Sequence, residues 1–297
     1  MPTTTTAQIT NLQEKVIGAA RLTLKDDEQP ITKGFHVERA NAGMDDTFNW
    51  PKLPGVTAFG LSEGVDMVSE SIVDSNMSVS ATEVGVAVEF TRKMLRTVNS
   101  ARFMRNMGTA MGSAVNVKKE QDVATLVDGF GNVIGLDGAP ATIGQLSAGQ
   151  SQLRANTEPL NSTMIGQLRA VVTPAMWHDL AQMLFPTGSG DSHAPMTAPP
   201  SEVSNRTFAR YGPTGNYFGT PIYLTTNLVA SGNNTRGGVW HPDAGLFYEF
   251  MPVDMYTDDS DKSLRSLEMG MVVDYGFGEA NDGFGREWDA DNTSPSS

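Results

Sequence analysis

The chain has 297 residues and carries 21 lysines and arginines against 34 aspartates and glutamates, a formal net charge of −13. This acidic balance argues against a general nucleic-acid coat, which would carry a basic excess. Cysteine is absent, so disulfides, thiolate metal sites and cysteine nucleophiles are excluded. Charged residues make up 19% of the chain, below the roughly 25% typical of soluble domains. This composition suits a subunit that hides much of its surface against neighbours.

The chain shows no targeting segment. Met1–Ala7 lacks a basic start followed by an apolar run, so a secretory signal is not expected. No stretch approaches the ~18 uninterrupted apolar residues of a membrane-spanning helix. We therefore expect a protein that is made and retained in a reducing cytosol and has no membrane partner.

The first part of the chain is predicted to be an arm followed by an extended loop. Residues 1–35 form the arm, in which Ala7–Leu22 is a short helix candidate with apolar residues at helical spacing. Residues 36–76 show no helical period and are interrupted by glycine and proline. A stretch this long without helix is usually functional, and we expect a hairpin that reaches away from the body.

Two predicted strands follow the loop. Apolar residues occupy the odd positions from Met77 to Ala81 and the even positions from Val84 to Phe90, so each piece is a half-buried strand. The change of parity near Glu83 would move every side chain to the other face of one continuous strand. We therefore expect a bulge or a bend there.

A long helix is predicted over Ser100–Asp128. Its expected apolar stripe consists of Phe103, Met107, Ala110 or Met111, Ala114, Val117, Ala124 and Val127. Gly108 and Gly112 weaken the helix but permit another backbone to approach closely.

Charge is distributed unevenly along the sequence. The stretch from Thr91 to Lys119 has seven basic residues and no acid, whereas Asp254–Asp291 has eleven acids and three bases. Opposite charges far apart in the sequence suit pairing between subunits, which sets register more than affinity. Two separately solvated faces are an equally good interpretation for any single pair.

A second lobe is predicted beyond a glycine-rich, hinge-like connector, Asp128–Pro140. Thr142 and Gln145 form a capping-box pattern, and Thr173-Pro174 is an N-cap signal that opens a second helix. Strands are predicted at Leu168–Val172, Tyr217–Thr226 and Gly238–Val253, with a polar loop at 186–214.

The clearest strand lies near the end of the chain. Apolar or aromatic residues occupy the odd positions from Leu267 to Phe277, and only Val272 breaks the alternation. The acidic tail from Trp288 to Ser297 is predicted to be loose.

A search for catalytic patterns leaves no enzyme signature. Gly129, Gly131 and Gly135 follow a helix with the wrong spacing for a dinucleotide fingerprint. Ser192 and His193 are adjacent in a glycine- and proline-containing loop, but adjacency alone does not make a catalytic triad. The four histidines are far apart, and the Asp258–Asp261 turn lacks the glycine and terminal glutamate of a calcium loop. We therefore expect no catalytic residue, no metal site and no cofactor.

The order of elements resembles the major capsid proteins of tailed bacteriophages, which have the Hong Kong 97-type fold. The stretches that carry the resemblance are SVSATEVGVAVEFTRKML (Ser78–Leu95), FGTPIYLTTNLVASG (Phe218–Gly232), GVWHPDAGLFYEF (Gly238–Phe250) and MGMVVDYGFGEAN (Met269–Asn281). It extends over nearly the whole chain and rests on order and texture rather than on an invariant motif.

The resemblance implies an α+β chain with four parts. These are an N-terminal arm (1–35), an extended β-hairpin loop (36–80), a peripheral domain with a long spine helix and long β-strands (81–137 and 246–297), and an α/β axial domain (138–245). Function would be self-assembly, as pentamers and hexamers, into an icosahedral shell around double-stranded DNA that is bound without sequence specificity. The protein would be assembled in the host bacterial cytoplasm and would end in the virion.

The resemblance also bears on partners. Some members of the family begin with a long scaffolding segment that is cleaved off, and about 35 residues before the loop leave no room for one, so we expect a separate scaffolding protein unless the chain is already processed. A portal and decoration proteins are further expected partners. Some members cross-link a loop lysine to a neighbour; Lys52 is the sole loop candidate here, although a simple surface lysine is the more ordinary interpretation.

The expected contacts between subunits combine a basic and an acidic group with Lys52. The basic group is Arg92, Lys93, Arg96 and Arg102, and the acidic group is Asp258, Asp259 and Asp261. Alternative interpretations are an encapsulin-like bacterial nanocompartment shell, a soluble serine hydrolase using Ser192 and His193, and a phage tail or adhesin protein, although the β-repeats usual in the last class are missing.

Overall fold

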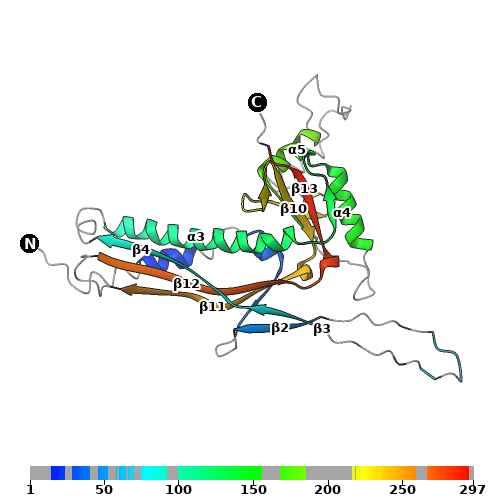
Figure 1. The fold of residues 1–297 in the computed structure, drawn as a ribbon, viewed down its shortest axis with the longest axis horizontal. Helices are drawn as coiled ribbons and strands as arrows, with labels where there is room; N and C mark the ends of the chain where they lie inside the picture. The colour runs from blue at the N-terminus through cyan, green and yellow to red at the C-terminus, as the bar shows by residue number, and fades with distance from the viewer. Residues whose placement is uncertain are drawn as a thin grey trace, which may run out of the picture.

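The computed structural model describes residues 15–23, 29–40, 46–52, 58, 60–64, 66–67, 69, 75–91, 100–155, 168–184, 216–217, 219–258 and 266–293. A long helix lies along a sheet of long strands, a smaller lobe stands at one end of this body, and a hairpin projects from it (Figure 1). The helices are α3 (Ser100–Asp128), α4 (Ile143–Ala155) and α5 (Pro174–Leu184), together with a helix over residues 15–23. Short 3-10 helices are η1 (Thr32–Gly34), η2 (Pro242–Ala244) and η3 (Asp282–Phe284).

The strands are β1 (His36–Arg39), β2 (Thr47–Lys52), β3 (Ser75–Ser80), β4 (Thr82–Thr91), β5 (Val133–Gly135), β6 (Arg169–Val172), β7 (Asn216–Tyr217), β8 (Thr220–Leu224), β9 (Ala230–Ser231), β10 (Asn234–Trp240), β11 (Gly245–Asp258), β12 (Ser266–Glu279) and β13 (Gly285–Asp291). They form a sheet in the order β1-β11-β12-β4, a second in the order β5-β13-β10-β6-β8-β7 with β9 beside β10, and the hairpin β2-β3.

The four-stranded sheet forms the body of the molecule. Its central strands, β11 and β12, each have 14 residues, or about 46 Å at ~3.3 Å per residue. β12 is antiparallel to both β11 and β4, whereas β1 joins the edge parallel to β11. The long strand predicted near the end of the chain is confirmed. Register shifts at Met251 mark bulges in β11.

The change of parity near Glu83 corresponds to a change of sheet. β3 pairs with β2 up to Ser80, and β4 pairs with β12 from Thr82. Ala81 lies between them and donates its N–H to the Asp46 carbonyl oxygen at 2.8 Å. The predicted bend is therefore confirmed, and it is the point at which the chain leaves the hairpin for the body.

Helix α3 has the predicted bounds, but one part of its predicted apolar stripe is wrong. Met111, Ala124 and Val127 are buried as expected, whereas Ala114 and Val117 are exposed. The buried face includes the charged side chains of Lys119 and Glu120. Choosing the stripe from apolar residues alone therefore predicted the wrong buried residues over this part of the helix.

The helix over residues 15–23 packs against Gly108 and Gly112 of α3. A Cβ at Gly108 would lie 2.4 Å from the carbonyl oxygen of Val16, and one at Gly112 would lie 2.8 Å from that of Ala20. Val16 and Ala20 are fully buried in the same core as the four-stranded sheet. The prediction that these glycines admit another backbone is confirmed, and its partner is the N-terminal part of the same chain.

The smaller lobe is built on the second sheet with α4 and α5 against it (Figure 1). The predicted capping box is present: Thr142 N–H donates to Gln145 Oε1 at 2.9 Å, and Gln145 N–H donates to Thr142 Oγ1 at 3.2 Å. Met176 N–H likewise donates to Thr173 Oγ1 at 3.3 Å, which confirms the second N-cap.

Two predictions about this lobe are wrong. The connector Asp128–Pro140 contains the strand β5, and the expected loose tail contains the last four residues of β13, with Trp288 fully buried. β13 pairs with β5 and β10. β13 was not predicted because its sequence is acidic and polar. Glu287 and Asp289 are accommodated in the strand because they contact an arginine of β10, as described below.

Candidate assembly surfaces

The hairpin is anchored at its base and exposed beyond it. Phe48 stacks on Tyr248 of β11 with ring centroids 4.1 Å apart, and Val79 is buried against the same strand. Gly276 of β12 admits this contact, since a Cβ there would lie 2.5 Å from the Ser80 carbonyl oxygen. Packing against the sheet therefore fixes the direction in which the hairpin leaves the body.

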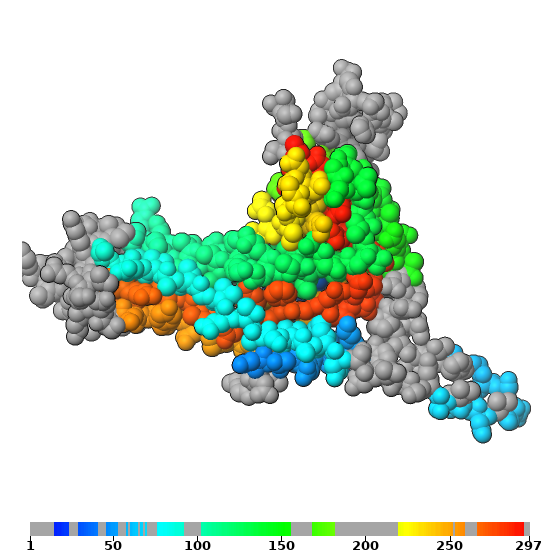
Figure 2. Space-filling model, in the orientation of Figure 1, coloured from blue at the N-terminus to red at the C-terminus, as the bar shows by residue number. Residues whose placement is uncertain are grey.

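Beyond this base, two large apolar side chains are mostly exposed. Residues 60–64 lie well away from the body, in light blue in Figure 2. Leu61 is 65% exposed and Met67 is 78% exposed. Exposed large apolar side chains on a projection suit a surface that binds another protein.

Lys52, the candidate loop lysine, is exposed at the end of β2, opposite Ser75. Its charge acts on Glu279, at the end of β12. Burial raises the pKa of Glu279, the neighbouring Asp282 raises it further, and Lys52 opposes the shift. Lys52 is thus near enough to Glu279 to favour the charged form of that carboxyl.

A buried ion pair joins α3 to the sheet beneath it. Lys119 Nζ lies 3.5 Å from Glu249 Oε1, and Arg39 Nε of β1 lies 2.9 Å from Glu249 Oε2. The Lys119 side chain is 7% exposed; burial lowers its pKa, and Glu249 partly restores it. One carboxylate of β11 thereby connects α3 with β1, and truncating it would leave a buried cation without its partner.

Glu120, the next residue of α3, holds the end of the arm. Its two carboxylate oxygens accept hydrogen bonds from the N–H groups of Ile31, at 3.1 Å, and Thr32, at 3.0 Å. Burial raises the pKa of Glu120, while these hydrogen bonds from Thr32 and Ile31 lower it. A carboxylate at the free N–H groups that open η1 is the arrangement that stabilises a helical N-terminus.

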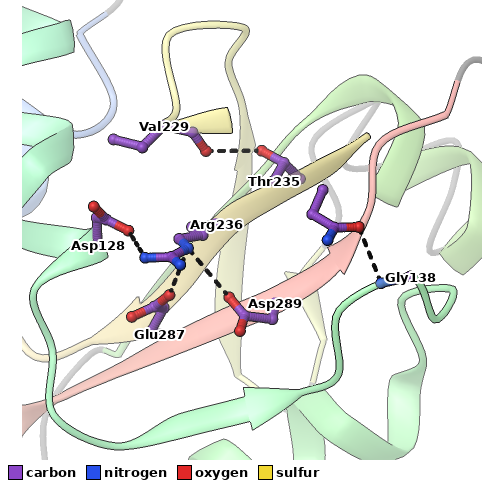
Figure 3. Close-up of polar contacts among 8 residues, drawn as sticks. Asp128, Gly138, Val229, Thr235, Arg236, Glu287 and Asp289 are labelled. Carbon is purple, nitrogen blue, oxygen red and sulfur yellow. Dashed lines mark hydrogen bonds and ion pairs between the residues drawn. The ribbon is translucent and has the colours of Figure 1, made fainter. Parts of the chain in front are cut away.

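A second charged cluster joins α3 to the smaller lobe (Figure 3). Arg236 of β10 binds Asp128, the last residue of α3, through Nη1, and its Nε lies 3.2 Å from Glu287 Oε1 and 3.9 Å from Asp289 Oδ1. Burial, followed by the Asp289 carboxylate, raises the pKa of Glu287 to about 8. One guanidinium therefore connects the long helix with two strands of the second sheet.

The predicted basic and acidic groups are only partly described. Arg102 is exposed on α3 and Asp258 is exposed at the end of β11, whereas Arg92, Lys93, Arg96, Asp259 and Asp261 lie outside the described residues. Thr91 of β4 pairs with Ser266 of β12. The basic segment follows Thr91 in the sequence, and the acidic segment lies between Asp258 and Ser266. Both segments are therefore connected to the same end of the four-stranded sheet.

The two residues considered above as a catalytic pair, Ser192 and His193, are not in the part of the chain that the structure describes. Within the described ranges no group of three or more histidine, aspartate or glutamate side chains is arranged to hold a metal ion. None of the described helices is long and apolar enough to cross a membrane.

Sequence reasoning missed the residues that hold the parts together. Glu120, Glu249 and Arg236 belong to different segments, and their partners lie far away in the sequence. A charged residue on the buried stripe of α3 was the one available signal, because such a residue is rarely buried without a partner.

Comparison with known proteins agrees with this architecture. The family described as phage capsid protein matches residues 76–290. Mycobacterium phage Che8 has a structure similar to this chain, with a TM-score of 0.59, 17% identity, and coverage of 83% of this chain and 85% of the other. The capsid of Ralstonia phage GP4 gives a TM-score of 0.63 with 11% identity and coverage of 91% and 93%. No curated protein sequence matches the chain.

The chain therefore belongs to the phage capsid protein family. Its fold is the Hong Kong 97 type, and it is a major capsid protein of a tailed-phage shell. The family match favours this assignment over the nanocompartment, hydrolase and tail-protein alternatives.

Proposed function

We propose that the chain acts by tiling with copies of itself, as pentamers and hexamers, into an icosahedral shell that encloses double-stranded DNA. The observation that supports this most is the hairpin, which is fixed at its base on β11 and β12 while Leu61 and Met67 remain exposed beyond it. A second copy would cover these side chains, and their burial would contribute to assembly. Catalysis plays no part in this proposal.

The proposal is tested with a pair of matched variants. We expect L61S/M67S to lower the yield of closed shells, counted by negative-stain electron microscopy, without changing the thermal unfolding of the unassembled chain. Leu136→Ser is the control, because Leu136 is equally exposed, at 69%, but lies between β5 and α4. Equal loss of shells in both variants would contradict a specific role for the hairpin.

The predicted domains are best adjusted to the two sheets. We propose that the arm (1–35) and loop (36–80) remain as predicted except for β1, which pairs in the four-stranded sheet. The peripheral domain would then contain α3, β4, β11 and β12, and the axial domain would include β5 and β13, since both pair in the second sheet.

Assembly in the host cytoplasm would require further partners. We propose a separate scaffolding protein, a portal and decoration proteins, to be tested by co-expression with candidate neighbours from the same genome. Lys52 is proposed as a contact rather than a cross-link. A boiled denaturing gel of assembled particles should then show a single monomer band, and a ladder of higher bands would contradict this.

A further inference from the structure

Two parallel helices form an exposed basic surface on one side of the body. Helix 15–23 and the first half of α3, residues 100–113, advance in the same direction, because Gly108 meets Val16 and Gly112 meets Ala20. We call these two segments the helical layer. Neither contains an aspartate or a glutamate. Their basic side chains are all exposed: Lys15, Arg21, Arg102 and Arg105.

These four cations are not neutralised by the described part of their own chain. None has a carboxylate oxygen within 4.0 Å among the described residues, whereas Lys118, further along α3, pairs with Asp122 at 2.6 Å. Because Val16 lies level with Gly108, Lys15 lies level with residue 107 of α3. Arg105 comes two residues earlier, so Lys15 and Arg105 are about 3 Å apart along the helix axis. Arg21 lies level with Ser113 by the same register, so the four cations are spread over about 16 Å along the helical layer.

The other face of the same sheet has the opposite charge. β4, β11 and β12 contain no lysine or arginine. Glu268 of β12 pairs in register with Glu89 of β4 on one side and with Asp258 of β11 on the other, and all three are exposed. Like charges directly opposite on neighbouring strands are destabilising. The acidic excess of the chain is thus separated from the helical layer by the sheet.

We propose that the helical layer binds the phosphates of duplex DNA, through Lys15, Arg21, Arg102 and Arg105. This inference rests on the proposed function, which places a polyanion at high concentration on one side of the shell. Duplex DNA carries one negative charge per ~1.7 Å of axis, so its phosphates can neutralise four cations spread along the helical layer without any base-specific contact. The acidic sheet face and the net charge of −13 keep the contact weak. Weak contacts of this kind hold a packaged duplex and still release it.

The test measures binding of a fluorescently labelled 20-base-pair duplex to the full-length, unassembled protein by anisotropy, from 50 to 200 mM salt. We expect R102Q/R105Q to weaken binding at least about tenfold at 50 mM salt and to reduce the slope of log K against log salt by about 2. The control is K52Q/R154Q, which removes two exposed cations outside the helical layer. It should leave both the affinity and the slope close to those of the wild type. Circular dichroism confirms that each variant is folded.

Three outcomes would overturn the inference. They are no binding of the duplex at 50 mM salt, equal weakening in both double variants, and binding of poly-glutamate as tight as that of DNA. The last result would assign the helical layer to an acidic protein. Electron microscopy of the same chain, supplied with its scaffold where one is required, separates this question from the proposed function. Shells that form without DNA binding overturn only the inference, whereas folded protein that never forms shells under these conditions overturns the function.

Discussion

Gly108 of α3 and Val16 of the N-terminal helix lie so close that a Cβ on Gly108 would be 2.4 Å from the Val16 carbonyl oxygen. This contact makes the N-terminal segment part of the main core, where Val16 and Ala20 are fully buried with side chains of β12. The described parts of the predicted arm, residues 15–23 and 29–35, therefore belong to the body, where Ile31 and Phe35 are buried in the same core.

Replacing Gly108 by alanine should destabilise the protein by about 1–3 kcal/mol, because the new methyl group meets main chain that has to move. Urea unfolding of the unassembled chain measures the change. Gly18→Ala is the matched control, since a Cβ at Gly18 meets nothing within 4 Å. Alanine is the better helix former there, so this variant should be neutral or more stable by up to ~1 kcal/mol. Equal effects in the two variants would contradict the close packing.

One side-chain oxygen of Gln145 accepts a hydrogen bond within the capping box and another from the buried indole of Trp288. Oε1 accepts hydrogen bonds from Thr142 N–H, at 2.9 Å, and from Trp288 Nε1–H, at 3.1 Å. Gln145→Ala should cost about 1–3 kcal/mol because it leaves a buried donor unpaired. Gln145→Glu keeps an acceptor oxygen and should recover most of this loss in the same chemical denaturation experiment. Failure of the glutamate variant to recover would mean that packing, not the hydrogen bond, governs this site.

The cluster around Arg236 should make stability depend on pH. Burial and Asp289 raise the pKa of Glu287 to about 8 from its ordinary value of 4.5. The folded state therefore holds a proton that the unfolded state has released over this range. The contribution is fully present below about pH 4.5 and is lost as the pH rises through 8.

This dependence is measured as the thermal midpoint of wild type and Glu287→Gln between pH 5 and pH 9. Other groups titrate in both proteins, so the difference between the two curves isolates Glu287. The wild type should lose more stability than the variant as the pH rises toward 9. Parallel curves would show that Glu287 titrates normally.

Charge reversal tests the predicted pairing of the basic and acidic groups. Arg102→Glu and Asp258→Lys are the variants that the described structure allows, because both side chains are exposed. Each should reduce the yield of shells, and the double variant should recover part of it if the charges meet between copies. Strictly additive losses of shell yield would show that the two charges do not pair.

The same double-mutant cycle on the unassembled chain decides a second question. Thr91 and Ser266 are paired in the sheet, so the two charged segments start from one end of a single copy. Coupling in the unfolding free energy of the monomer would place the pairing within a chain. Coupling in shell yield alone would place it between chains.

Local signals were sufficient for the elements whose side chains follow one period. The long strand from Leu267 to Phe277, the bounds of α3, and the caps at Thr142 and Thr173 could all be predicted, because alternation, helical spacing and capping chemistry are properties of neighbouring residues. The change of parity near Glu83 was equally informative, since the strand before it pairs with β2 and the strand after it pairs with β12.

The remaining features depend on partners that are distant in the sequence. β13 looked like a loose tail because its acidic residues are balanced by Arg236 of β10, about fifty residues earlier. β5 has three residues, too few to show a period, and is held by pairing with β13. Ala114 and Val117 were placed on the buried face of α3 because they are apolar, whereas the charged residues Lys119 and Glu120 occupy that face.

Cryo-electron microscopy of particles formed by the purified full-length chain, with its scaffold where one is required, tests the central claim most directly. We expect closed icosahedral shells of pentamers and hexamers in which the hairpin beyond Lys52 lies on a neighbouring copy and covers Leu61 and Met67. Protein that remains folded and monomeric under every assembly condition, or shells in which these two side chains stay exposed to solvent, would contradict it.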